Sequence, residues 1–92
     1  MIRSFNDGDT ARLFDDEVVA RFRAFERPAR RKLLYLHRAR TLNDLMAPPG
    51  NRLEALNGDR QGQHSIRIND QFRLCFVWTP QGPQYVEIGD YH

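Results

Sequence analysis

The last three residues of the chain, Asp90, Tyr91 and His92, have side chains of the types that suit chemistry on a phosphate. Cleavage of RNA without a metal needs a base for the 2′-OH proton, an acid for the leaving 5′-oxygen, and cations that stabilise the phosphorane. Histidine suits proton transfer near neutral pH, and tyrosine can stack on a base. We therefore take these residues as catalytic candidates, with Asp90 and His92 sharing the acid and base roles in an unassigned order. The alternative is an exposed chain end without function.

Arginine is almost the only cation in the chain. Of its 14 basic residues, Lys32 is the only lysine, although the net charge is only +2. A guanidinium binds phosphate with two hydrogen bonds and stacks on bases, but a genome rich in G and C would produce the same bias. We expect a phosphate site along residues 48–76, and its candidate residues are Arg52, Arg60, Arg67 and Arg73.

Size and composition predict one globular domain over residues 1–92. Hydrophobic residues make up 40% and charged residues 28% of the chain. No apolar run approaches the roughly 20 residues that a membrane helix needs, and the start of the chain lacks a signal peptide, so we expect the cytoplasm and no membrane partner. The single cysteine, Cys75, and the scattered His37, His64 and His92 predict no metal site and no cofactor.

Two helices are expected in the first half of the chain. Asp9 or Thr10 can cap the first. The segment from Val18 to Phe25 is expected to continue it after a break near Asp15 and Asp16. The second helix should begin near Pro28, with Ala29, Leu33, Leu36 and Ala39 on one face. Its opposite face carries Arg27, Arg31 and Arg38, which form either a solvated surface or a surface for ribosomal RNA or an acidic partner.

Alternating apolar residues predict strands in the rest of the chain. The expected strands cover residues 1–5, 53–56, 63–68, 72–78 and 85–88. The fold class is therefore α+β, with two N-terminal helices packed on one face of a mostly antiparallel sheet in the order β-α-α-β-β-β-β.

The turn between Ile68 and Phe72 determines which residues face each other. Only a three-residue loop, Asn69 to Gln71, keeps every apolar side chain on one face, because a one-residue slip would reverse the faces. This register sets Arg67 directly opposite Arg73 on the other face. Like charges in that position repel, so either an anion bridges them or Glu87, which has the same parity, neutralises them.

Regular alternation in the last strand would point polar residues at the end of the chain into the core. Val86 and Ile88 face the core, and a regular strand would send Asp90 and His92 there too. Burial of an unpaired aspartate is costly, so we expect the strand to end or bulge near Gly89 and to turn both residues toward the arginines.

The central part of the chain resembles a known family. The stretches Pro-Pro-Gly-Asn-Arg-Leu-Glu-Ala-Leu, Gly-Gln-His-Ser-Ile-Arg-Ile-Asn and Gln-Phe-Arg-Leu-Cys-Phe, with the start Met-Ile-Arg-Ser-Phe and the end Val-Glu-Ile-Gly-Asp-Tyr-His, are similar to HigB-type toxins, the plasmid maintenance system killer proteins. The resemblance covers nearly the whole chain and is weakest from Asp7 to Arg40.

This resemblance implies a small toxin of the RelE/ParE superfamily that cleaves mRNA in translating 70S ribosomes without a metal. It also implies a HigA-like helix-turn-helix antitoxin and repression of the operon through the antitoxin complex on operator DNA. Asp90, Tyr91 and His92 match the family's catalytic tail, Arg73 matches a phosphate-contacting arginine, and Arg67 is taken as a second. The alternatives are a ParE-like inhibitor of DNA gyrase and a non-catalytic co-repressor partner.

The chain departs from some relatives before its Gly-Asp-Arg turn. Those relatives carry histidine and lysine where this chain has Glu54 and Asn57. The loss of two cations weakens phosphorane stabilisation, and we therefore expect a slow or conditionally weak toxin.

Overall fold

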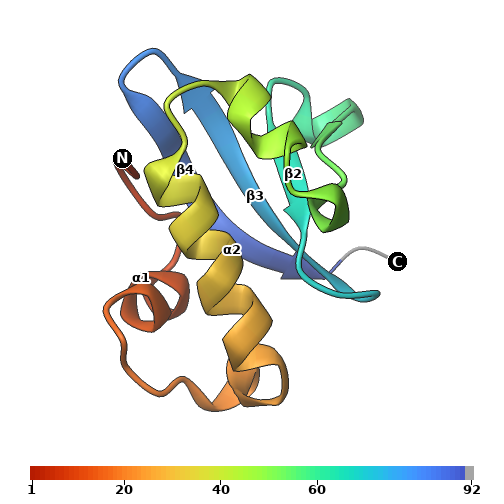
Figure 1. Cartoon of the computed structure of the whole chain (residues 1–92). Coiled ribbons are helices and arrows are strands. Elements are labelled where there is room, and N and C mark those ends of the chain that lie inside the picture. The colour runs from red at the N-terminus through yellow and green to blue at the C-terminus, as the bar shows by residue number, and fades with distance from the viewer. Residues whose placement is uncertain (91–92) are drawn as a thin grey trace.

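The computed structural model describes residues 1–90 and has a four-stranded sheet with helices against one face (Figure 1). The strands are β1 (Glu54–Ala55), β2 (His64–Arg67), β3 (Phe72–Thr79) and β4 (Gly82–Asp90). They follow one another across the sheet in chain order, and each neighbouring pair is antiparallel. The α+β class with two α-helices and an antiparallel sheet is thus confirmed.

Helix α2 (Glu26–Arg38) lies across the sheet and supplies the middle of the core (Figure 1). Its Ala29, Leu33 and Leu36 are fully buried, as the helical period predicts. On the sheet, alternate residues face this helix, and they are Ile66, Ile68, Leu74, Phe76, Val86 and Ile88. Before α2, the 3-10 helix η1 (Ala20–Phe25) ends with Phe25, whose ring stacks on Phe72 with centroids 4.2 Å apart.

Helix α1 (Gly8–Phe14) begins earlier than expected, because Asp7 caps it. The Asp7 carboxylate accepts a hydrogen bond from the Thr10 amide at 3.0 Å, so the predicted cap at Asp9 or Thr10 is wrong. Thr10 is instead fully buried, and its hydroxyl accepts a hydrogen bond from the Ile88 amide of β4 at 3.3 Å. This contact attaches α1 to the sheet.

The strand expected over residues 1–5 is reduced to a single parallel bridge between Phe5 and Val86. Hydrogen bonds still run from Arg3 to Pro83 and from Asn6 to Val86, at 2.8 and 2.9 Å. Between them β4 bulges at Tyr85, where φ is 54°, and the Tyr85 amide donates to the Ser4 hydroxyl instead of a backbone carbonyl. The bulge therefore interrupts the ladder that a fifth strand would need.

Three short 3-10 helices lie between α2 and β2, at the end of the sheet where β1 and β2 lie (Figure 1). They are η2 (Leu42–Met46), η3 (Pro49–Asn51) and η4 (Gly58–Arg60). Thr41 and Asp44 form a capping box at η2, and Pro49 is the first residue of η3. Within residues 1–90, no helix is both long and apolar enough to cross a membrane.

Candidate functional site

Arg73 on β3 is held in one orientation by backbone and hydroxyl oxygens. Its Nε donates to the Ser65 hydroxyl at 2.7 Å, and its Nη2 donates to the carbonyls of Arg52 at 2.5 Å and of Ser65 at 3.3 Å. Only 14% of the side chain is exposed. Within residues 1–90, its Nη1 has no hydrogen-bond acceptor. The guanidinium is therefore prearranged and keeps donor capacity for an anion.

Arg67 lies directly opposite Arg73, in the register that the sequence predicts. The three-residue turn is confirmed, since the Ile68 amide donates to the Phe72 carbonyl at 3.0 Å and Asn69 Oδ1 accepts from the Phe72 amide at 2.7 Å. Arg67 forms an ion pair with Asp70 of this turn, whose side chain is 99% exposed. Such an exposed pair is weak, so a phosphate could replace the carboxylate.

The second explanation for the paired arginines, neutralisation by Glu87, is wrong. Glu87 accepts a hydrogen bond from Arg60 Nη1 at 2.8 Å and another from the Asn6 amide group at 3.0 Å. Arg67 and Arg73 each have separate acceptors instead, from Asp70 and from the Arg52 carbonyl. The two cations are tolerated because each has an oxygen acceptor of its own.

Two further residues border Arg73 on the side of β1. Glu54 places its Oε2 3.9 Å from Arg73 Nη2, and its side chain is 59% exposed. Arg52 is exposed and adopts a left-handed conformation, with φ 44° and ψ 60°. A carboxylate thus lies beside Arg73, and it lowers the positive potential there.

The end of β4 runs beside Arg73, since Gly89 is the partner of Arg73 and Asp90 is the partner of Phe72. We expected the strand to end or bulge near Gly89 and to turn Asp90 and His92 toward the arginines. For Asp90 this is wrong, because the pairing is regular from Glu87 to Asp90 and the bulge lies at Tyr85. Asp90 therefore has the parity of Phe72 and not of the arginines. It avoids burial because it is exposed at the end of the sheet, where it accepts from Gln71 Nε2 at 2.9 Å. For His92 the expectation lies outside the described residues.

Tyr91 and His92, two of the catalytic candidates, lie outside the described residues. Of the remaining candidates, the structure places Arg67 opposite Arg73 and brings the backbone carbonyl of Arg52 to the Arg73 guanidinium. Arg60 is directed to Glu87 and Gln63, by hydrogen bonds of 2.8 and 3.2 Å from its Nη1.

Lys32 and Asn51 are the residues that sequence reasoning missed. Lys32 is 8% exposed and donates from Nζ to Asn51 Oδ1 at 2.5 Å, and Asn51 is fully buried. Burial lowers the pKa of Lys32, and the charges of Arg31 and Arg67 lower it further. One signal was available, because the helical period places Lys32 beside the buried face of α2 and it is the only lysine.

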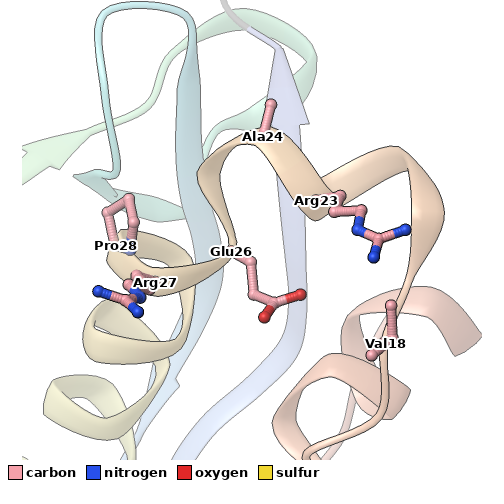
Figure 2. Close-up of a pocket in the computed structure, with 6 residues that line it drawn as sticks. All are labelled: Val18, Arg23, Ala24, Glu26, Arg27 and Pro28. Atoms are coloured by element: carbon pink, nitrogen blue, oxygen red, sulfur yellow. The ribbon is translucent and has the colours of Figure 1, made fainter.

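Two pockets of the described residues lie away from the candidate site. A pocket of about 450 Å³ opens where η1 meets α2 and is lined by Val18, Arg23, Ala24, Glu26, Arg27 and Pro28 (Figure 2). A smaller one of about 230 Å³ lies between α1 and α2. Among these residues, no group of three His, Cys, Asp or Glu could hold a metal.

Comparison with known proteins shows which family this chain is similar to. A family model described as the RelE-like toxin of the type II toxin-antitoxin system HigB matches residues 1–92. Toxin HigB-1 of Vibrio cholerae serotype O1 is 39% identical over 81 residues, which cover 86% of this chain and 85% of that protein. An uncharacterized protein of Haemophilus influenzae is 41% identical over 48 residues, which cover 52% of this chain and 48% of that protein.

Proposed function

The chain belongs to the HigB-like family of RelE-like toxins of type II toxin-antitoxin systems, and on this premise we propose that it is an endoribonuclease that cleaves mRNA on translating ribosomes. The observation that supports this most is the anchored guanidinium of Arg73, with Arg67 opposite it and the end of β4 beside it. Translation would stop because the message is cut. The toxin would act in the cytoplasm.

The proposed reaction uses only side chains of this chain. Asp90 or His92 removes the proton of a 2′-OH, the oxygen attacks the adjacent phosphorus, and the bond from phosphorus to the 5′-oxygen breaks. The other residue protonates the leaving 5′-oxygen, which leaves a cyclic phosphate and a 5′-OH. Arg73 and Arg67 stabilise the negative charge of the phosphorane, and Tyr91 stacks on the neighbouring base.

The proposed partners are those that the family implies. A HigA-like helix-turn-helix antitoxin would neutralise the toxin, and the complex of both would repress the operon by binding operator DNA. The ribosome would present the mRNA. Arg52 and Arg60 would add contacts to phosphates away from the reacting one.

Brief induction followed by mapping of transcript 5′ ends tests the proposal. New 5′ ends within translated messages are expected, and His92→Ala should reduce their formation about 10²- to 10⁴-fold, the range of general acid–base catalysis. The variant should still bind the antitoxin. The matched control His64→Gln should cleave normally, because His64 pairs with Phe76 on the helix side of the sheet.

Three outcomes would contradict the proposal in different ways. Undiminished toxicity of His92→Ala would remove the chain end from the mechanism. Double-strand DNA breaks with intact mRNA would indicate a ParE-like gyrase inhibitor. Harmless overexpression would indicate a co-repressor without catalysis.

A further inference from the structure

Lys32 is a buried cation whose described hydrogen-bond partner is a neutral amide. It lies on α2 with 8% of its surface exposed, and no carboxylate of residues 1–90 forms an ion pair with it. Its Nζ lies 5.4 Å from the centre of the Tyr35 ring and donates to Asn51 Oδ1 at 2.5 Å. An ammonium group is costly to bury with only a neutral acceptor. An apolar side chain at position 32 would pack in this place without the cost of burying a charge. The presence of a lysine there therefore suggests a role other than packing.

The hydrogen bond of Lys32 orients Asn51. Lysine only donates and a carbonyl only accepts, so the amide oxygen must face Lys32 and the amide nitrogen must face the Leu45 carbonyl, 3.1 Å away. The backbone amide of Asn51 also donates to the Pro48 carbonyl at 3.0 Å. Asn51 is thereby fixed through its side chain and its backbone, and it is fully buried.

Asn51 in turn determines the position of the next residue. Arg52 has φ 44°, a conformation that residues other than glycine adopt only when their surroundings hold them. In this conformation its carbonyl accepts from Arg73 Nη2 at 2.5 Å. The Arg52 carbonyl and Ser65 together hold the guanidinium of Arg73.

We infer that Lys32 and Asn51 are positioning residues for Arg73, acting through the backbone of Arg52. They connect helix α2, on one face of the sheet, to the candidate phosphate ligand on the other. The positioning itself is a property of the structure, whereas its effect on cleavage rests on the proposed function. The two are therefore measured separately.

The first experiment is independent of activity. In the ¹⁵N NMR spectrum of the purified protein, the Nε–H of Arg73 should exchange with water much more slowly than that of exposed Arg27. Lys32→Met keeps an unbranched side chain, shorter by one atom, and removes its donor, and it should accelerate the Arg73 exchange. Arg30→Met, on the same helix, removes ion pairs with Glu26 and Asp16 and should leave that exchange unchanged. Thermal unfolding checks that both variants fold.

The second experiment measures cleavage on ribosomes. Lys32→Met should cleave roughly 10- to 100-fold more slowly, as expected for a displaced catalytic cation. In an Arg73→Gln background it should have no further effect, because residues that act through one another are not additive. Additive losses would show a general structural role and overturn the inference.

If Lys32→Met does not fold, the exchange rate of the unaltered protein still provides a test. Fast exchange of the Arg73 Nε–H in the unaltered protein would overturn it without any variant. If the exchange is slow and responds to Lys32→Met while the protein cleaves no RNA, the positioning stands and the proposed function fails.

Discussion

At the scale of single residues, Arg67 and Arg73 differ in how ready they are to bind an anion. Arg73 is held by oxygens of Ser65 and Arg52 and has 14% of its side chain exposed. Arg67 is 32% exposed and pairs with the fully accessible Asp70. A prearranged donor loses little entropy on binding, so we expect Arg73 to contribute to transition-state stabilisation and Arg67 to affinity.

Removing the charge of Glu54 should strengthen RNA binding. Its carboxylate lies 3.9 Å from Arg73 Nη2 and competes with a phosphate. Because exposed ion pairs contribute about 0–1 kcal/mol, Glu54→Gln should raise affinity by up to about fivefold. Titration with a 2′-deoxy RNA analogue at low salt measures this. Glu17→Gln changes the net charge equally outside this site, and an equal gain there would attribute the effect to net charge alone.

Adding a cation at Asn57 should increase cleavage. Asn57 is exposed before η4 and makes no capping hydrogen bond with its side chain, so substitution disturbs little. Asn57→Lys should raise the cleavage rate on ribosomes, since a nearby cation stabilises the phosphorane. Asn43→Lys, at an exposed position of η2, controls for the added charge. An unchanged rate in Asn57→Lys would contradict the idea that lost cations make this toxin slow.

At the scale of elements, the contacts between α1, α2 and β4 determine where the sheet ends. Thr10 of α1 accepts a hydrogen bond from Ile88 of β4, and Val86 and Ile88 pack in the core. These contacts keep β4 regular to Asp90 and hold its end beside Arg73. The helices therefore support a site on the face of the sheet that they do not cover.

Thr10→Val tests this support. The substitution keeps the shape of the side chain and leaves the buried Ile88 amide without its acceptor, at a cost of about 1–3 kcal/mol. Urea denaturation should show this loss in the free energy of unfolding. Thr10→Ser keeps the hydroxyl and should lose less. Equal losses in both variants would mean that packing of the methyl group, and not the hydrogen bond, stabilises this contact.

At the scale of the whole molecule, the start of the chain closes the structure over His37. His37 Nδ1 accepts a hydrogen bond from the Ile2 amide at 3.2 Å, and its ring lies 5.0 Å from Phe14. The adjoining Gly82 must be a glycine, because φ there is 129° and a Cβ would lie 2.2 Å from the Met1 carbonyl oxygen. The first residues are thus attached to the folded core, against which Ile2 and Phe5 pack.

The partial burial of His37 beneath the first residues predicts how the stability of the fold depends on pH. Burial lowers the pKa of His37, and the positive N-terminus and Arg38 lower it further. Below the ordinary value of about 6.5, the unfolded chain binds a proton that the folded chain does not, so stability falls as pH falls. His37→Gln should flatten the dependence of the urea midpoint on pH between about 7 and 5. An undiminished slope in this variant would assign the dependence to other groups.

The sequence by itself determined the class of fold, the buried face of α2 and the register of β2 with β3. These follow from local periodicity, since only one arrangement of Ile66, Ile68, Leu74 and Phe72 keeps the apolar side chains together. The sequence motifs also predicted the family, and the comparisons confirm it.

Only the tertiary structure decided how Arg73 is held and where β4 bulges. The acceptors of Arg73 come from Arg52 and Ser65, and Lys32 reaches Asn51 from 19 residues away. Such contacts depend on how the helix, the loop and the sheet pack, and the local periodicity of apolar residues does not determine this packing. The bulge at Tyr85 likewise depends on Ser4, which lies 81 residues earlier in the chain and supplies an acceptor for its amide.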